Sequence, residues 1–265
     1  MSRCNRSSDV AVVIPAYGHE QLTINVVKDL ESDTMANCDV YIVDNGGDFP
    51  LDVTGAAVLR PGTNLGWAGG CNFGLATTQA LGYGAHMLLN NDVSLSQDFV
   101  SGMQEAFART TGGLVGPLYD HNWSHQRSDY LGDARNFRGR ATDRRVPFID
   151  GTCMLIGSVA LERTGMLDDS YWRRHGWGCD KDYALRVRSW GGTVWVTERS
   201  YLNHFARRTA AELPGFSELE AERENDEGMM AKWGPQWQDL LYAGFPLMSR
   251  MGMVQARIAR EEKDD

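Results

Sequence analysis

The sequence predicts an α/β protein with a mostly parallel central sheet, flanking helices and a helical C-terminal extension. In the first half of the chain, short apolar runs rich in β-branched residues alternate with amphipathic stretches, the pattern of βαβ units. Several of these runs end abruptly in Asp or Asn, as strands do where polar groups collect at the carboxyl edge of a parallel sheet. With 42% hydrophobic and 23% charged residues, the chain can bury an ordinary globular core.

The first βαβ unit spans residues 10–44. Val10–Ile14 is a continuous apolar run stopped by Pro15, which fits a strand buried on both faces. Apolar residues at helical spacing follow over 22–30, and 40–43 forms a second strand that ends at Asp44. At a carboxyl edge, the Asp44 carboxylate could accept hydrogen bonds from a nucleotide base or ribose. A turn-forming Asp beside Asn-Gly-Gly is the alternative.

A third short strand at 56–59 precedes a glycine-rich stretch. Asn64–Gly74 holds four glycines in eleven residues. Glycines let the backbone approach a ligand closely, and a helix that follows offers N–H groups to phosphate. The stretch is neither the dinucleotide-binding fingerprint nor a P-loop, because it lacks both G-x-G-x-x-G after a strand and Gly-Lys-Ser/Thr.

The stretch Met87–Val93 has the clearest polar tip. Three apolar residues end in Asn90, Asn91 and Asp92, as expected for a buried strand with polar groups at its carboxyl end. A lone carboxylate flanked by amides suits a hard divalent cation that also carries phosphate oxygens. A strand followed by an Asn-rich turn is the alternative.

The second half of the chain predicts a helix at 99–107 and strands at 114–118, 148–156 and 193–196. Between them, 119–147 is polar and aperiodic, with five Arg among residues 135–145. A loop of this length predicts a flap near the site, or else a solvated insertion. A helix over 183–190 would place Asp180 and Asp182 in its first turn, where the helix dipole favours anions.

Charge and cysteine usage exclude several functional classes. The net charge of −9 and sequence pI near 5.2 argue against sequence-independent binding of nucleic acid. The five cysteines form no Cys-x-x-Cys pair and fit no zinc module, which favours a reducing cytoplasmic compartment. The N-terminus is polar, unlike a signal peptide, and no apolar run approaches the roughly 18 residues of a membrane span. We therefore expect a cytoplasmic protein, with peripheral membrane association left open.

Taken in order, these motifs resemble the family 2 glycosyltransferases of GT-A fold, a Rossmann-like nucleotide-diphospho-sugar transferase fold. The donor-side motifs are Pro15–Tyr17, Asp44–Gly46, Asn64–Gly74 and Leu88–Asp92. The acceptor-side motifs are Asp150–Ile156, Gly165–Asp168 and Trp177–Asp182 with Arg186. The resemblance covers about residues 10–205 and is closest to the rhamnosyltransferase-like and galactofuranosyltransferase-like branch.

The resemblance implies a role for each matching position. Asp180 would be the general base, and Asp92, with His204 as a further ligand, would hold Mn²⁺ or Mg²⁺. The substrate-binding residues would be Pro15, Tyr17, Asp44, Asn64, Gly70, Asn72, Asn90, Asn91, Trp177 and Asp182. Two positions depart from the family pattern, Asn90 in place of Asp and Cys179 in place of Glu. Without the resemblance, the alternatives are that Asp180 and Asp182 are helix N-terminal charges and that His204 is a satisfied strand-end histidine.

The implied function is inverting, metal-dependent transfer of a sugar from a UDP-, dTDP- or GDP-linked donor to a glycan, lipid-linked or protein acceptor. One alternative is a nucleotide-sugar-binding protein of the same fold with little or no turnover. A sugar-phosphate nucleotidyltransferase is a weaker alternative, because residues 15–18 contain no Lys.

The implied domain organisation is a catalytic domain at 1–213 and a C-terminal helical extension at 214–265. Within the catalytic domain we expect a donor half at about 10–118, a flexible loop at about 119–147 and an acceptor half at about 148–213. The C-terminal helices are a candidate surface for homo-oligomer formation.

Overall fold

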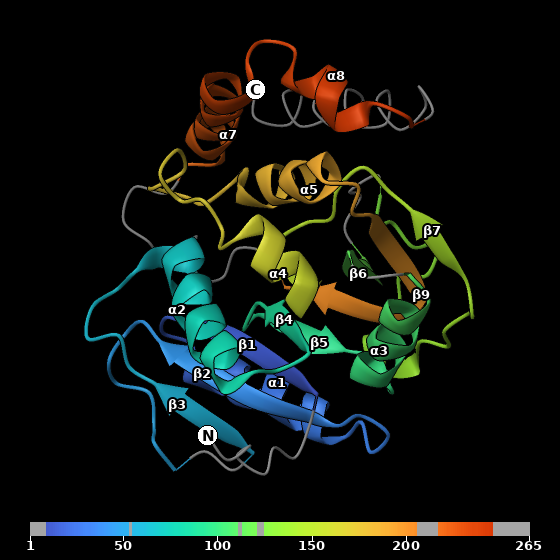
Figure 1. Cartoon of the computed structure of the whole chain (residues 1–265). Helices are drawn as coiled ribbons and strands as arrows, with labels where there is room; N and C mark the ends of the chain where they lie inside the picture. Colours follow the sequence, from blue (N-terminus) through green and yellow to red (C-terminus); the bar gives the residue numbers. More distant parts are fainter. Residues whose placement is uncertain (1–8, 53–54, 111–112, 121–124, 206–216, 246–265) are drawn as a thin grey trace, which may run out of the picture.

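The computed structural model describes residues 9–52, 55–110, 113–120, 125–205 and 217–245. Within these ranges the chain forms one nine-stranded sheet with helices on both faces (Figure 1). The strands are β1 (Val10–Ala16), β2 (Cys38–Asp44), β3 (Ala56–Leu59), β4 (Ala85–Leu89), β5 (Val93–Leu95), β6 (Leu114–Tyr119), β7 (Asp143–Arg145), β8 (Cys153–Gly157) and β9 (Val194–His204). The helices are α1 (Glu20–Glu31), α2 (Gly66–Leu81), α3 (Phe99–Arg109), α4 (Ser158–Thr164), α5 (Cys179–Ser189), α7 (Glu218–Trp233) and α8 (Trp237–Tyr242).

The first half of the sheet is parallel, as the sequence predicts. The strand order β3-β2-β1-β4 is parallel throughout, and every residue of β1 is buried. Ala16 at the end of β1 lies beside Asp44 at the end of β2. Because parallel strands end at the same edge, the residues after β1, β2 and β4 meet there.

The second half of the sheet is mixed. Strand β8 runs antiparallel to β4 and β6, and both β5 and β7 run antiparallel to β9, whereas β6 and β9 are parallel. The expectation of a mostly parallel sheet therefore holds for β3-β2-β1-β4, and the other strands depart from it. Apolar periodicity identifies a strand but carries no information about its direction of pairing.

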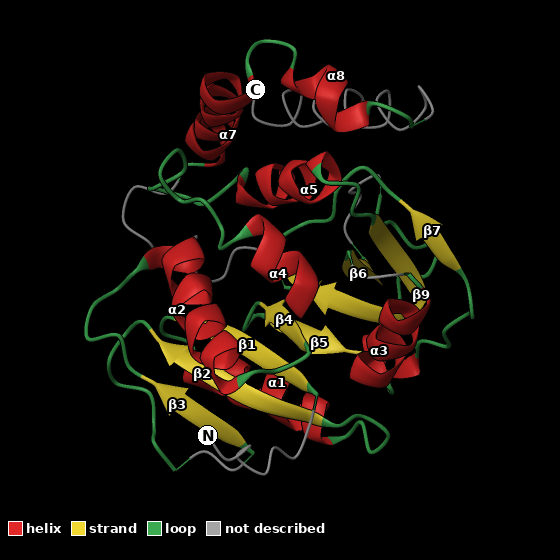
Figure 2. Ribbon diagram, viewed as in Figure 1, coloured by secondary structure: helices red, strands yellow, loops and turns green. Residues whose placement is uncertain are grey.

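Helices cover both faces of the sheet (Figure 2), and a hydrophobic core lies on each face. Side chains alternate along β1, because successive residues of a strand point to opposite faces. Val12 and Ile14 pack in the core that includes α1 and α3, whereas Val13 packs in the core that includes α2, α4 and α5. The sequence-predicted apolar faces are thus the faces that meet the sheet.

The described part of the C-terminal extension packs on the body of the protein. Helices α7 and α8 lie beyond α5, as Figure 1 shows, and Met229 and Leu241 belong to the same core as Tyr183 of α5. The expected boundary at 213 and the segment 246–265 lie outside the described residues. None of the helices in the described ranges is both long and apolar enough to cross a membrane.

The described residues of the expected loop at 119–147 make defined contacts with β9. The Ala134 N–H donates to Asn203 Oδ1 at 2.7 Å, and Phe137 stacks on Tyr201 with ring centroids 4.9 Å apart. Arg144 forms an ion pair with Glu198 at 2.8 Å. Movement of this segment when a ligand binds stays a prediction.

Candidate active site

A cleft of about 610 Å³ lies along the carboxyl edge of the parallel strands and extends over the start of α5. Most of the residues predicted from the sequence line it. They are Pro15, Tyr17, Asn64, Asn90, Asn91, Asp92, Trp177, Asp180 and His204. The two halves of the sheet therefore contribute to a single site.

The start of α2 forms one wall of the cleft. Gly66, Trp67, Ala68 and Gly69 line it, so the first turn of this helix faces the space. The first N–H groups of a helix have no partner within the helix, and the helix dipole adds positive potential there. This wall therefore suits the negative charge of a diphosphate.

Asn90 is oriented by a tryptophan on the opposite wall. The Trp67 indole Nε1–H donates to Asn90 Oδ1 at 2.8 Å. An indole N–H can only donate, so the amide atom that faces it must be the oxygen. The Asn90 amide nitrogen therefore points away from Trp67 and is available to donate a hydrogen bond to a bound oxygen.

Gly151 leaves the space that Trp67 occupies, and Gly176 lies beside the indole at ordinary contact distance. A Cβ on Gly151 would lie 2.7 Å from Trp67 Cη2, and a Cβ on Gly176 would lie 3.6 Å from Trp67 Cε3. The indole thus packs against backbone from both flanks, which restricts its rotamers. Asn90 is held by a rigid donor.

Asp92 and His204 lie together although they are distant in sequence. Strand β5 pairs antiparallel with β9 so that Val93 stands opposite His204, and the Phe205 N–H donates to the Asp92 carbonyl at 2.9 Å. His204 Nε2 is 3.4 Å from Asp92 Oδ1. Burial acts to lower the pKa of His204, but the hydrogen bond to Asp92 and the carboxylates of Asp92, Asp150 and Asp120 raise it above its ordinary value.

These two side chains fit a partly protein-bound divalent cation. Among the described residues, no group of three or more His, Cys, Asp or Glu side chains could enclose a metal alone. Mg²⁺ and Mn²⁺ sites that serve phosphate chemistry use few protein ligands and keep positions for water and substrate oxygens. A carboxylate and an imidazole 3.4 Å apart can share such an ion.

Asp180 lies at the start of α5, as predicted, and faces the cleft while only 9% exposed. Burial raises the pKa of this carboxyl; Lys181 lowers it, and the nearby Asp150 raises it further, for a net upward shift. Desolvation is the largest cause of this shift, and the expectation that the helix dipole keeps Asp180 ionised stays a prediction. A raised pKa suits a base that works near neutral pH.

Cys179 does not share this position. Its side chain is fully buried, it does not line the cleft, and its Sγ–H donates to the Asp168 carbonyl at 3.4 Å. Burial and the neighbouring Asp180 and Asp182 raise the pKa of the Cys179 thiol. This thiol is therefore a packing residue and a poor nucleophile or base.

Asp150 is a site residue that the sequence analysis placed only within a motif. It lines the cleft, and its Oδ1 accepts hydrogen bonds from the Thr152 N–H at 2.9 Å and the Thr152 hydroxyl at 2.5 Å. It interacts electrostatically with both Asp180 and His204, which places it between the two halves of the site. The Asp-Gly-Thr sequence before β8 was the only feature of the sequence that pointed to Asp150.

Asp44 lies outside the cleft lining. It is 3% exposed and accepts hydrogen bonds from the Gly47 N–H at 2.7 Å, the Phe49 N–H at 3.0 Å and Arg60 Nε at 3.0 Å. These contacts fit the turn-forming alternative. Its neighbour Asn45 lines the cleft instead, and contact of Asp44 with a base stays a prediction.

Gly70 and Asn72 serve the packing of α2. A Cβ on Gly70 would lie 2.8 Å from Asn45 Nδ2, so the glycine permits close approach of the helix to the strand ends. Asn72 accepts from the Leu167 N–H and donates to the Leu167 carbonyl, both at 2.9 Å. With both amide atoms engaged, the expectation that Asn72 binds substrate is replaced by a structural role.

Asp182 does not line the cleft, and its contacts disfavour the prediction that it binds substrate. Asp182 is 0% exposed and forms ion pairs with Arg186 at 2.8 Å and Lys232 at 2.7 Å. The Trp233 Nε1–H donates to it at 2.9 Å. The helical rotation between positions 180 and 182 puts the two carboxylates on different faces of α5, so only Asp180 reaches the cleft.

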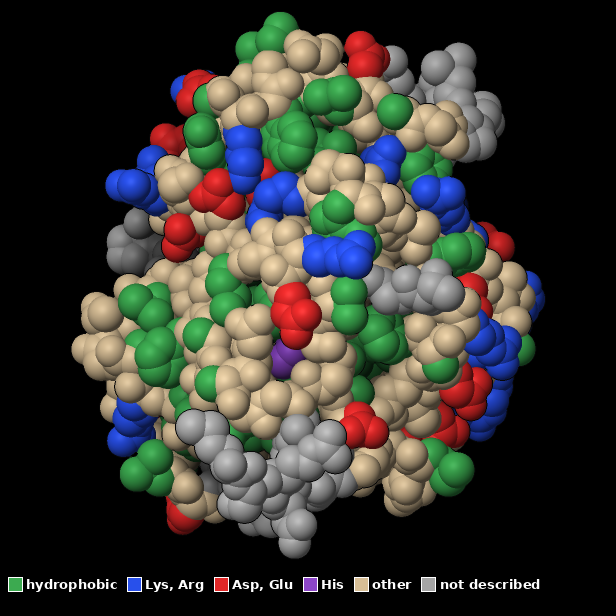
Figure 3. All heavy atoms as spheres, viewed as in Figure 1, with side chains coloured by type: hydrophobic (Ala, Val, Ile, Leu, Met, Phe, Trp, Pro, Cys, Tyr) green, Lys and Arg blue, Asp and Glu red, His purple; other side chains and the backbone are tan. Residues whose placement is uncertain are grey.

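Cationic side chains also line the acceptor side of the cleft. Arg173, Arg174 and Lys181 do so, together with His175. Lys181 Nζ donates to Asn225 Oδ1 at 3.0 Å, and Arg174 pairs with Glu220 at 2.8 Å. On the face drawn in Figure 3, Lys and Arg side chains gather over α5 and α7. Lys181 lies within the Trp177–Asp182 motif, whereas Arg173, Arg174 and His175 follow no periodic pattern that marks them as site residues.

Comparison with known proteins places the chain in a family. The model of the family "Glycosyl transferase family 2" matches residues 11–165. Three uncharacterised proteins, one from Mycobacterium bovis and two from strains of Mycobacterium tuberculosis, are each 38% identical over 199 residues, which cover 75% of this chain and 75% of theirs.

A solved structure shares the fold. The crystal structure of GalNAc-T7 with UDP, GalNAc and Mn²⁺ matches with a TM-score of 0.60 at 14% identity, over 90% of this chain. The match spans 50% of the GalNAc-T7 chain, so this chain corresponds to about half of that protein. The likeness confirms the predicted GT-A fold.

Proposed function

This chain belongs to glycosyl transferase family 2, and we propose that it transfers a sugar from a nucleotide-diphosphate donor to an acceptor hydroxyl. The observation that carries the proposal is one cleft lined by Asp92 from the donor half and by His204 and Asp180 from the acceptor half. We further propose that the reaction inverts the anomeric carbon and needs Mn²⁺ or Mg²⁺. The rhamnosyltransferase-like and galactofuranosyltransferase-like branch is our proposal for the subfamily.

The donor half of the cleft would hold the nucleotide diphosphate. Pro15, Tyr17 and Asn64 would flank the nucleoside, and the first turn of α2 would offer N–H groups to phosphate oxygens. The Asn90 amide nitrogen would donate to a donor oxygen, because its oxygen already accepts from Trp67. Asp92 and His204 would hold the divalent ion, which when bound neutralises charge on the departing diphosphate.

The acceptor half would supply the proton acceptor. Asp180 would remove the proton from the attacking hydroxyl, a role that typically contributes roughly 10²–10⁴-fold. Burial raises the pKa of Asp180, and the negative charge of the nearby Asp150 raises it further. The higher pKa would make Asp180 a stronger base. A single attack from the face opposite the leaving group would give inversion.

A binding protein with little or no turnover is the second candidate function. This candidate is favoured by Cys179, which stands where the family usually has Glu. A buried thiol cannot replace a carboxylate. Asp180 is unaffected by this change, which is why we rank transfer first.

A panel of UDP-, dTDP- and GDP-sugars tests the proposal. The purified full chain is incubated with each donor, with and without Mn²⁺ or Mg²⁺, and release of free nucleoside diphosphate is measured. Metal-dependent release from one donor class is expected. Saturable binding of a donor without any release, over long incubation with mixed glycan and lipid-linked acceptors, would favour the binding-protein candidate.

A further inference from the structure

The loop that leads into Asp180 is held by one carboxylate of the C-terminal extension. Glu224 of α7 accepts hydrogen bonds from the Arg174 and His175 backbone N–H groups, each at 2.9 Å, and from His175 Nδ1 at 3.0 Å. Its side chain is 20% exposed and that of His175 is 5% exposed. A single carboxylate thus fixes the backbone a few residues before the proposed base.

The indole of Trp172 fills the space between this loop and α7. Trp172 is 1% exposed and donates through Nε1 to the Asn225 carbonyl at 3.4 Å. A Cβ on Gly178 would lie 2.5 Å from that nitrogen, and a Cβ on Gly228 of α7 would lie 2.3 Å from it. Both glycines are needed for α7 to pack this closely on the loop, because any larger residue would collide with the indole.

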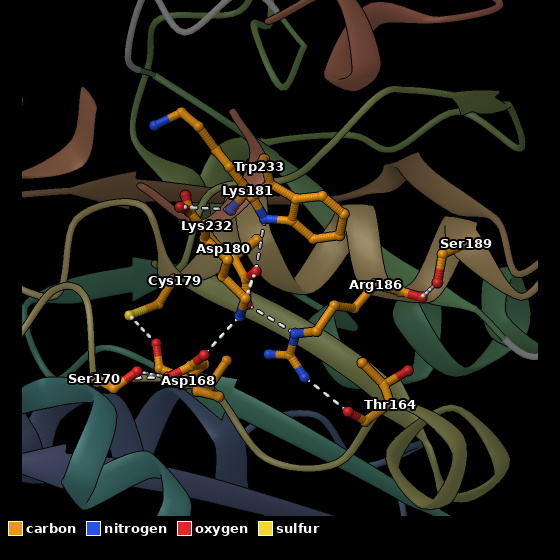
Figure 4. A network of polar contacts seen from close by, with 12 residues as sticks. Thr164, Asp168, Ser170, Cys179, Asp180, Lys181, Arg186, Ser189, Lys232 and Trp233 are labelled. Atoms are coloured by element: carbon orange, nitrogen blue, oxygen red, sulfur yellow. Dashed lines mark hydrogen bonds and ion pairs between the residues drawn. The ribbon is translucent and has the colours of Figure 1, made fainter. Parts of the chain in front are cut away.

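A partly buried ionic network also joins α7 to α5 (Figure 4). Lys232 contacts Asp168 at 2.6 Å and Asp182 at 2.7 Å, and Arg186 completes the pairing of Asp182. Asp182 is 0% exposed, so loss of its cationic partners would leave an uncompensated buried charge, which is strongly unfavourable. The network therefore fixes the position of α7 relative to α5.

From these contacts we propose that α7 is a positioning element for the acceptor half of the site, with Glu224 as its principal positioning residue. Glu224 sets the path of residues 172–178, and this path sets where Trp177 and Asp180 stand in the cleft. The inference rests on the proposed function of Asp180 as the base. It gives the C-terminal extension a part in the reaction.

The donor half of the cleft is positioned by other contacts. Its lining residues from β1, α2 and the end of β4 are placed by the parallel strands and by contacts such as Trp67 with Asn90. Weakening the hydrogen bonds that Glu224 accepts should therefore impair the chemical step and leave donor binding intact. A general loss of stability would impair both.

Glu224→Gln and Glu220→Gln form a matched pair of variants. In Glu224→Gln, the new amide can accept only one of the two backbone N–H groups and turns a donor toward the other. Glu220 lies on the same helix and pairs with the Arg174 guanidinium, where the side chains are 45% and 60% exposed, so the loss of this pair should cost little.

Kinetics on the donor identified by the nucleotide-sugar panel provide the first measurement. For Glu224→Gln we expect kcat to fall about tenfold with donor KM within about twofold, as for a lost buried hydrogen bond at a positioned group. Glu220→Gln should match the wild type in both constants. Gly228→Ala, which pushes α7 away from Trp172, should reproduce the effect of Glu224→Gln.

Hydrogen exchange provides a measurement that needs no activity. In Glu224→Gln, exchange should rise in peptides covering 172–181 and stay unchanged in peptides covering 64–75 and 87–95. Equal exchange in the two Glu variants would overturn the proposal. So would faster exchange with unchanged kcat, because the contact would then be only structural.

The outcomes separate the two proposals. If the wild type releases nucleotide from no sugar, the proposed function fails, and the catalytic part of this inference fails with it. If the wild type is active but Glu224→Gln raises donor KM at unchanged kcat, the proposed function stands and the assignment of α7 to the acceptor half is wrong.

Discussion

The two sides of the cleft are built in different ways. On the donor side, neighbouring parallel strands end at one edge, and each polar group follows directly on its own strand. On the acceptor side, Asp180 stands on a helix whose place is set by contacts with α7 and with the loop 172–178. Local sequence organises the first side, and long-range packing organises the second.

This difference predicts distinct signatures for mutations. Changes on the donor side should alter nucleotide and metal binding, because those residues sit at fixed strand ends. Changes on the acceptor side should alter the chemical step and leave donor affinity unchanged. Single substitutions on each side of the cleft test that separation.

Asp92→Ala should have the largest effect. It removes the carboxylate that follows β4, where a metal carrying diphosphate would bind, and Lewis-acid stabilisation is worth several kcal/mol. We expect transfer to fall by at least roughly 10³-fold and metal-dependent nucleotide binding to be lost. Calorimetric titration with UDP, dTDP and GDP, each with and without Mn²⁺, measures this. Unchanged metal dependence would contradict the role of Asp92.

Asp180→Asn should lower transfer by roughly 10²–10⁴-fold while donor affinity stays the same. Its pKa is raised in the folded protein, so the acidic limb of the wild-type rate profile should lie above the ordinary Asp pKa of about 3.9. Activity should rise with pH through that limb, because the base works when deprotonated.

Cys179→Ala is the control for Asp180→Asn, because it changes the adjacent residue without touching the cleft. It should keep most of the activity. Equal loss in both variants would show that disruption of the start of α5, and not removal of a base, explains the effect.

His204→Ala should weaken metal affinity with a smaller loss of activity than Asp92→Ala. One neutral ligand can be replaced by water, whereas a carboxylate also supplies charge. Titration of Mn²⁺ in the presence of nucleotide compares the two variants. Wild-type metal affinity in His204→Ala would assign His204 to packing at the end of β9.

Trp67→Phe removes the indole N–H that orients Asn90 but keeps an aromatic ring in the same space. The loss of one hydrogen bond should raise donor KM by roughly three- to tenfold, with a smaller change in kcat. Steady-state kinetics with the donor varied measure kcat and donor KM separately. A fall in kcat at unchanged KM would place Trp67 with the acceptor side and break the separation.

Asp168 should contribute a small acid-sensitive part of stability on the acceptor side. Burial acts to raise its pKa, but hydrogen bonds from Lys232 and Ser170 lower it to about 2. Because folding lowers the pKa of this carboxyl, its ionised form stabilises the folded state at pH values above its unfolded pKa of about 3.9. This contribution is lost as the pH falls toward the folded-state pKa of about 2. Thermal unfolding of wild type and Asp168→Asn should therefore differ more at pH 7 than at about pH 2.5. A constant difference would contradict the assignment.

The sequence by itself determined the donor half. The buried run before Pro15, the amphipathic stretch after it and the polar tip at Asn90–Asp92 are local patterns, and each element lies where its pattern predicts it. Strands buried on both faces and amphipathic helices depend on the spacing of nearby residues, so the pattern along the chain can identify them. The start of α5 at Cys179, which puts Asp180 in the first turn of a helix, follows from the same local rule.

Only the tertiary structure decided the rest of the site. His204 meets Asp92 because β9 pairs antiparallel with β5, and no periodicity specifies that pairing. Asp180 and Asp182 look equivalent in the sequence, yet one faces the cleft and the other is buried between Arg186 and Lys232. The hydrogen bonds that Glu224 accepts from the N–H groups of residues 174 and 175 join segments far apart in the chain. Such contacts depend on how elements pack, which local residue spacing does not encode.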